Sequence, residues 1–129
     1  MALTASGDVV LVRQFREAVR QALLEIPAGI FDVEGEDAAG CAARELLEET
    51  GYRATSIEPL GGIYTSPGFA DERIELFVAG AEPVEGGLVE DGIDVVTMPF
   101  QEALALVRGG EIRDAKTVAG LLLAAGRQG

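Results

Sequence analysis

The sequence predicts an α/β (α+β) sandwich with a mixed sheet, built as a single domain over residues 1–129. Apolar runs of strand length and segments with helical periodicity follow one another in an irregular order, and no repeat or linker separates them. Hydrophobic residues make up 48% of the chain and charged residues 25%, an ordinary globular balance. A chain of 129 residues can bury a sufficient core without disulfides.

Five strand segments are expected, each an apolar run bounded by turn residues or proline. Their residue ranges are 9–12, 22–26, 53–64, 72–79 and 93–98. Gly61-Gly62 predicts a bend, so the range 53–64 forms one strand or two. The acidic, glycine-rich segment 82–92 is expected to be a mobile surface loop.

Three helices are expected, over residues 38–50, 100–108 and 114–125. The first is the best defined, because Asp37 can cap its N-terminus and Gly51 can end it in a left-handed conformation. In the last helix one buried face is expected to hold Val118, Leu121, Leu122 and Ala125.

The composition excludes several classes of function. The chain has no histidine, so Ser-His-Asp and Cys-His catalysis and the usual zinc sites are absent. Its net charge of -12 argues against a long nucleic acid as partner. It has no apolar run of membrane-spanning length and no recognisable signal peptide, so no membrane association is expected. The single cysteine, Cys41, is expected to be a buried hydrophobe, and a cytoplasmic location is predicted.

The most informative segment is the acidic face of the first helix. Glu45, Glu48 and Glu49 occupy positions i, i+3 and i+4, so a helix brings them onto one face. Like charges at this spacing destabilise a helix, and Arg44 can offset only part of the repulsion. A divalent cation would offset more, because Mg²⁺ and Mn²⁺ prefer oxygen ligands. A solvated acidic face with an internal ion pair is equally compatible with these residues alone.

The flanks of this helix distinguish the two interpretations. The segment runs Arg44-Glu45-Leu46-x-Glu48-Glu49-x-Gly51-Tyr52. This pattern resembles the second half of the Nudix box, the motif of hydrolases that cleave a nucleoside diphosphate linked to another group. Glu36 lies eight positions before Arg44, which is the family spacing. The first half departs from the motif, since Ile30 stands where the box has a glycine and Gly29 comes one residue earlier.

Further stretches resemble the ADP-ribose pyrophosphatases within that superfamily. They are residues 11–16, 25–29, 65–69 and 114–117. The resemblance implies an α/β/α sandwich, N-terminally short, that uses Mg²⁺, with Mn²⁺ as a substitute. It also implies hydrolysis of ADP-ribose, or a similar nucleoside diphosphate sugar, to AMP and a sugar phosphate by a homodimer. A house-cleaning nucleoside triphosphate pyrophosphatase and a non-catalytic nucleotide-binding module remain as alternatives.

The resemblance also assigns roles to residues. Metal ligands are implied at Glu45, Glu48, Glu49 and the Ala28 carbonyl, and Arg44 would orient the acidic cluster. Substrate contacts are implied at Arg16, Pro67, Gly68 and Phe69. At least two of Phe15, Phe31 and Phe69 are expected in the hydrophobic core rather than stacked on a nucleobase, because aromatic side chains are more often core. Lys116 can bind phosphate or stand exposed at a helix start.

The resemblance places a water-activating acid in the loop before the next-to-last strand, and two residues compete for that role. The residue type favours Glu90, whereas counting back from Pro99 favours Asp91. An aspartate reaches one methylene less far than a glutamate. Mobile loops commonly complete such sites only when substrate binds. A solvated acidic loop is the alternative for both residues.

Overall fold

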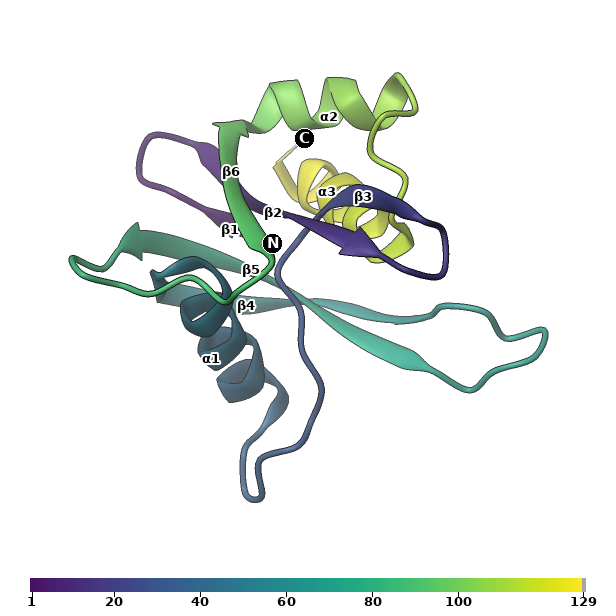
Figure 1. Cartoon of the computed structure of the whole chain (residues 1–129), viewed down its shortest axis with the longest axis horizontal. Coiled ribbons are helices and arrows are strands. Elements are labelled where there is room, and N and C mark those ends of the chain that lie inside the picture. The colour runs from purple at the N-terminus through teal and green to yellow at the C-terminus, as the bar shows by residue number, and fades with distance from the viewer. Residues whose placement is uncertain (129) are drawn as a thin grey trace.

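The computed structural model describes residues 1–128, which form six strands and three helices (Figure 1). The strands are β1 (Ala2–Leu3), β2 (Asp8–Arg16), β3 (Gln21–Glu25), β4 (Tyr52–Tyr64), β5 (Arg73–Pro83) and β6 (Ile93–Pro99). The helices are α1 (Ala38–Thr50), α2 (Phe100–Arg108) and α3 (Ala115–Gln128). No helix within residues 1–128 is both long and apolar enough to cross a membrane.

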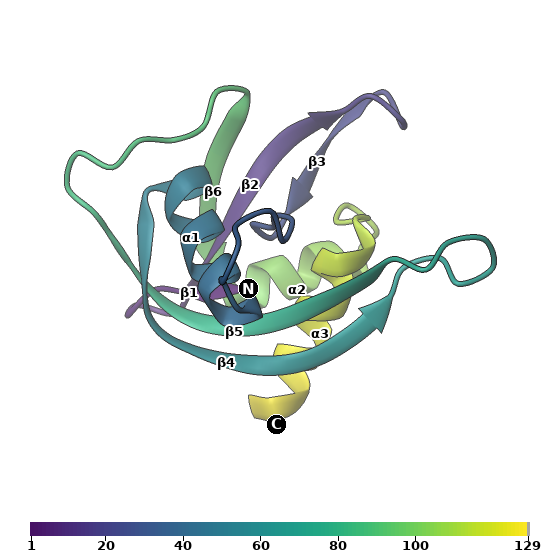
Figure 2. The same ribbon diagram turned by 90° about the horizontal axis from the view of Figure 1, so that it is seen from below.

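The strands form one mixed sheet in the order β3-β2-β1-β5-β4, and β6 pairs with β2. The short β1 is parallel to β5, whereas the other paired strands are antiparallel. In Figure 2 the long β4–β5 ribbon curves beneath α1 and is crossed by α3, whose C-terminal end lies below it. The predicted mixed sheet is therefore confirmed, and 52–64 is one strand with irregular pairing near Ala54 and Pro59.

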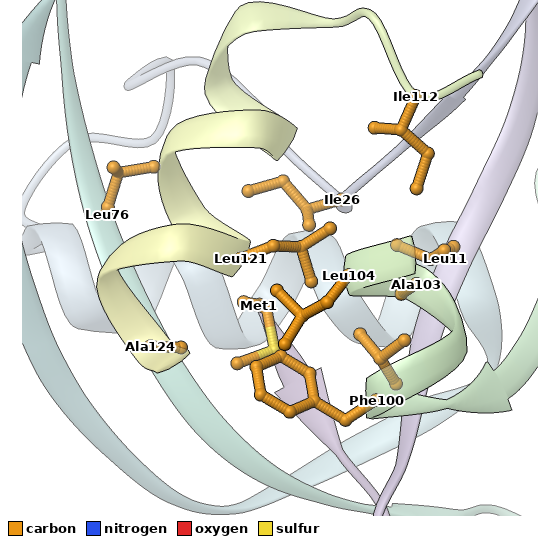
Figure 3. Packing of buried hydrophobic residues seen from close by; sticks show 11 residues of the cluster. Met1, Leu11, Ile26, Leu76, Phe100, Ala103, Leu104, Ile112, Leu121 and Ala124 are labelled. Carbon is orange, nitrogen blue, oxygen red and sulfur yellow. The ribbon is translucent and has the colours of Figure 1, made fainter. Parts of the chain in front are cut away.

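Side chains of β2 point alternately to the two faces of the sheet and pack against helices on both faces. Val9 and Leu11 enter a core cluster with residues of α2 and α3 (Figure 3). Val10, which points the opposite way, packs in a second cluster with Leu46 of α1. The sheet thus lies between α1 on one side and α2 with α3 on the other, which confirms the predicted sandwich.

Helix α1 begins and ends where its sequence predicts. The Asp37 carboxylate accepts a hydrogen bond from the Gly40 N–H at 2.7 Å, which caps the N-terminus. Gly51 adopts a left-handed conformation with φ of 73° and donates its N–H to the Leu47 carbonyl. These two caps fix the helix that carries the acidic face.

Several side-chain placements differ from expectation. Phe15, Phe31 and Phe69 are 54%, 63% and 89% exposed, so the expectation that at least two of them lie in the core is wrong. They lie outside the packed layers, on the β2–β3 hairpin, the loop before α1 and the β4–β5 turn. In α3, Leu122 is 47% exposed, and Ala124 is buried instead. The predicted burial of Cys41 is confirmed.

The turn between β2 and β3 contains a strained residue, and this leads to a stability prediction. Arg20 has φ of 55°, a conformation that disfavours residues with a Cβ. Arg20→Gly is expected to raise the free energy of unfolding by about 0.5–1 kcal/mol, net of the added freedom of the unfolded chain. Urea denaturation checks this. An equal gain from Arg20→Ala would show that the backbone conformation is not the cause.

Candidate functional site

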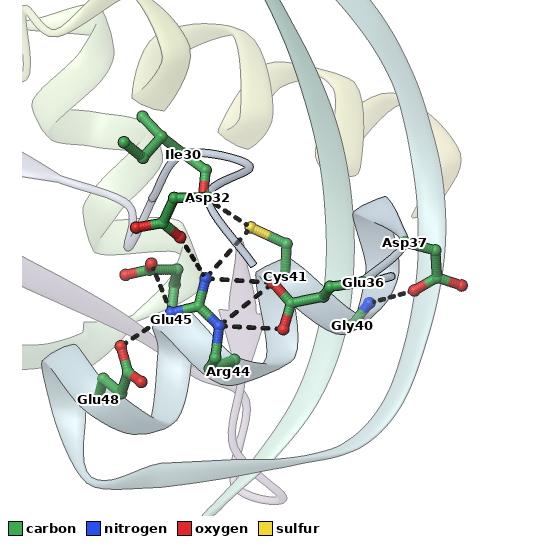
Figure 4. Close-up of polar contacts among 9 residues, drawn as sticks. All are labelled: Ile30, Asp32, Glu36, Asp37, Gly40, Cys41, Arg44, Glu45 and Glu48. Atoms are coloured by element: carbon green, nitrogen blue, oxygen red, sulfur yellow. Dashed lines mark hydrogen bonds and ion pairs between the residues drawn. The ribbon is translucent and has the colours of Figure 1, made fainter. Parts of the chain in front are cut away.

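Arg44 gathers acidic side chains around the outer part of α1 (Figure 4). Its Nη1 lies 3.0 Å from Glu45 Oε1 and 3.0 Å from Glu48 Oε2. Its Nε lies 3.0 Å from Glu36 Oε2, and Asp32 completes the set at 3.3 Å. Arg44 therefore neutralises part of the acidic face and holds the preceding loop against the helix.

Glu49 is the acidic residue of α1 that Arg44 does not reach. It is 9% exposed, and its carboxylate accepts a hydrogen bond from the Ala28 N–H at 3.1 Å. Within residues 1–128 no lysine or arginine forms an ion pair with it. Burial raises the pKa of Glu49 to about 7; the charges of Glu45 and Glu90 add to this effect, and the Ala28 hydrogen bond opposes it. Glu49 is thus a buried carboxylate without a cation in ion-pair contact, and the charge of Lys116 acts on it only at longer range.

Glu45 lies beside Glu49 against the same loop backbone. A side chain at Gly29 would collide with the Glu45 carboxyl group, so only glycine allows this approach. Burial raises the pKa of Glu45, and Arg44 opposes that rise. The side chain of Glu48 is 55% exposed and turns toward Arg44 instead. Across residues 1–128 no three acidic or cysteine side chains already form a cluster suited to a cation.

The loop after β5 brings one of its two candidate acids to α1. Leu88, Val89 and Glu90 line a shallow hollow together with Leu47 and Glu48. The Glu90 charge also acts on the Glu49 carboxylate, as the raised pKa of Glu49 reflects. Neither observation involves Asp91.

Glu25, which was not among the predicted site residues, is a buried carboxylate that forms ion pairs with two basic side chains. Glu25 is 1% exposed, and its Oε1 lies 2.7 Å from Arg16 Nη2 and 2.6 Å from Lys116 Nζ. Burial alone would raise the pKa of Glu25, but these two partners hold it below its usual range. The sequence signals for Glu25 were its acidic type within the apolar run before Pro27 and its place in the 25–29 stretch that resembles the family.

The start of α3 fixes this group of charges to the end of β3. Asp114 accepts hydrogen bonds from Thr117 N–H at 3.2 Å and from Thr117 Oγ1 at 2.6 Å. Thr117 Oγ1 in turn accepts the Ile26 N–H at 2.9 Å. The Lys116 side chain is 11% exposed and pairs with Asp114 and Glu25, so it does not stand in solvent. The position of the Pro27–Gly29 segment therefore depends on α3.

Lys116→Met is expected to lower the free energy of unfolding at pH 7 by about 1.5–3 kcal/mol, because it removes a charge-assisted hydrogen bond from a buried carboxylate. Urea denaturation measures the loss. Arg127→Met is the matched control, since its pair with Glu58 is exposed and is expected to contribute at most about 1 kcal/mol. Equal losses in the two variants would contradict a special role for burial.

A cavity of about 800 Å³ lies between the β2–β3 hairpin, the loop before α1, the β4–β5 ribbon and the start of α3. Its lining includes Arg16, Ala28, Gly29 and Lys116. The acidic residues of α1 flank this cavity behind the Ala28–Gly29 backbone and do not line it. A cavity of this size suits a nucleotide-sized ligand.

The structure does not bring the predicted Pro67, Gly68 and Phe69 contacts to the cavity. They occupy the turn between β4 and β5, beyond Thr65 and Glu72, which do line it. Phe69 is 89% exposed there. Their assignment as substrate contacts stays a prediction, as do the roles of the other site residues.

The chain is similar to known proteins of one family. The model of the NUDIX domain matches residues 1–121. The chain is 40% identical over 121 residues to "ADP-ribose pyrophosphatase" of Bacillus subtilis, covering 91% of this chain and 65% of that protein. It is 46% identical over 122 residues to "GDP-mannose pyrophosphatase" of Cronobacter sakazakii, covering 86% and 63%.

A solved structure described as an ADP compounds hydrolase has the same fold. The TM-score is 0.83 at 23% identity, over 98% of this chain and 69% of the other. The chain spans less than two thirds of the length of the two relatives named above. The domain match covers nearly the whole chain and includes the acidic helix with its flanks. This chain belongs to the NUDIX domain family.

Proposed function

We propose that this domain hydrolyses the diphosphate bond of ADP-ribose or a similar nucleoside diphosphate sugar, with AMP and a sugar phosphate as products from ADP-ribose. The observation that carries the proposal is Glu49, a buried carboxylate without a cation beside the acidic Glu45. A buried carboxylate without an ion-pair partner costs stability, and carboxylates with a raised pKa are enriched at functional sites, which supports a functional role for Glu49. The names of the two relatives support nucleoside diphosphate sugars as the substrate class.

The donor set fits a divalent metal. Glu45 and Glu49 offer carboxylate oxygen atoms, which divalent ions such as Mg²⁺ prefer, and Nudix domains in general use divalent ions. We propose Mg²⁺, with Mn²⁺ as a substitute, held by Glu45, Glu49, Glu48 and the Ala28 carbonyl. When bound, the metal supplies positive charge that neutralises the substrate diphosphate.

The other residues would bind, orient or accept protons. Arg44 holds Glu45 and Glu48 in fixed orientations through its ion pairs. Arg16, fixed by Glu25 at the edge of the cavity, would donate to the diphosphate or the ribose. Glu90 would accept the proton of the water that attacks phosphorus. Asp91 is the alternative acid for this step.

The test is product analysis with purified protein and Mg²⁺. ADP-ribose, GDP-mannose and a nucleoside triphosphate are supplied in parallel, and the products are resolved by chromatography. AMP from ADP-ribose, or GMP from GDP-mannose, supports the proposal. Pyrophosphate released only from the triphosphate would favour a house-cleaning enzyme instead. Binding by calorimetry without any cleavage would favour a non-catalytic nucleotide-binding module.

A further inference from the structure

The loop that carries Glu90 is attached to α1 through the residue that ends the helix. Val84 donates its N–H to the Gly51 carbonyl at 2.9 Å. Gly87 then donates its N–H to the Val84 carbonyl at 2.9 Å, which closes a turn over residues 84–87. This turn is exposed, but these hydrogen bonds tie it to Gly51.

Gly87 makes the closest backbone approach in this turn. A Cβ at position 87 would lie 3.0 Å from the Gly51 carbonyl oxygen, 3.0 Å from the Val84 carbonyl oxygen and 3.1 Å from the Gly51 Cα. All three are backbone atoms, which cannot rotate away as the end of a flexible side chain can. Gly87 is not among the glycines with positive φ, so the close contact with backbone atoms, rather than backbone conformation, disfavours a larger residue here.

The chain that follows Gly87 runs back along α1. Leu88, Val89 and Glu90 border the hollow whose opposite side is Leu47 and Glu48. Only two residues separate Gly87 from Glu90, so a shift of the turn on Gly51 must move the Glu90 carboxylate. The place where the turn meets Gly51 thus sets the distance between Glu90 and the acidic face.

We propose that Gly87 is a positioning residue whose backbone contact with Gly51 docks the 84–92 loop on the end of α1 and thereby places Glu90 beside the acidic face. This inference rests on the proposed function, because Glu90 is the residue assigned to activate water. The docking contact itself belongs to the backbone, so it can be measured without substrate.

The test compares Gly87→Val with Gly86→Asn in the full chain. Residue 86 has φ of +73°, which asparagine tolerates, and a Cβ there would have no neighbour within 4 Å. In Gly87→Val the Val84 amide is expected to exchange hydrogen at least about 10-fold faster, because its bond to Gly51 is lost. The kcat is expected to fall about 10- to 100-fold with KM changed less than about threefold. Gly86→Asn is expected to match wild type in both measurements.

A double-mutant cycle then tests whether the fall in kcat in Gly87→Val depends on Glu90. If Gly87 acts by placing Glu90, the Gly87→Val/Glu90→Gln protein is no slower than Glu90→Gln alone. Losses that multiply, or unchanged exchange of the Val84 amide in Gly87→Val, would overturn the inference. A wild-type protein that cleaves no nucleoside diphosphate overturns the proposed function instead. In that case the exchange result still supports or overturns the docking contact.

Discussion

Glu49→Gln is expected to lower kcat for nucleoside diphosphate sugars by about 10²- to 10³-fold and at the same time to stabilise the metal-free protein. The amide keeps the shape of the side chain and can still accept the Ala28 N–H through its carbonyl oxygen. It lacks the negative charge that a divalent metal requires. The substitution also removes a carboxylate that is 9% exposed and forms no ion pair within residues 1–128.

The gain in stability has a defined pH dependence. The pKa of Glu49 is 4.5 in its ordinary state and about 7 in the folded protein, chiefly because of burial. Between these values the folded protein keeps a proton that the unfolded chain has released, so rising pH destabilises the wild type. The difference between Glu49→Gln and wild type should be near zero below pH 4.5 and grow to about 1–3 kcal/mol above pH 7.

Urea denaturation in a chelator at about pH 4 and about pH 8 measures this difference, since the two conditions bracket the shifted pKa. Glu48→Gln is the control for stability, because the Glu48 side chain is 55% exposed and its charge therefore loses little hydration energy on folding. Added Mg²⁺ should raise the wild-type midpoint more than that of Glu49→Gln. Equal stability of Glu49→Gln and wild type at the higher pH would contradict the argument.

The sequence predicted those parts of the fold that depend on neighbouring residues. Helix α1 has its expected bounds because Asp37 and Gly51 cap it locally. Strand β2 was predicted too short, because residues 13–16 are mostly exposed and extend the strand through pairing with β3 and, at residues 13 and 14, with β6. That pairing depends on the register of two strands, which an apolar pattern does not reveal.

In the candidate site, too, the sequence predicted contacts between neighbouring residues but not contacts between distant ones. Helical periodicity was sufficient to place Glu45 and Glu49 together, because the residues belong to one helix. Glu25 and Lys116 are separated by 91 positions, so no local pattern could predict their contact. Helical spacing pairs Arg44 with Glu48, but only the structure shows that no other cation forms an ion pair with Glu49 within residues 1–128.

Glu90→Gln is expected to lower kcat by about 10²- to 10⁴-fold, whereas Asp91→Asn is expected to stay within about threefold of wild type. Glu90 borders the hollow beside Glu48, and its charge acts on Glu49, while Asp91 takes part in neither. A carboxylate that accepts a proton from water must lie within reach of that water, and an amide of the same size cannot replace it. The two variants differ by one position on the same loop, so each controls for disturbance of the loop by the other.

The dependence of the rate on Mg²⁺ separates a proton acceptor from a metal ligand. If Glu90 accepts the proton, Glu90→Gln lowers the rate at saturating Mg²⁺ and leaves the half-saturating concentration within about threefold of wild type. A metal ligand would instead raise that concentration, because metal affinity depends on each ligating oxygen. A larger loss in Asp91→Asn than in Glu90→Gln would assign the acid to Asp91. The loop would then have to rotate when substrate binds, since Asp91 borders neither the cavity nor the hollow in the structure.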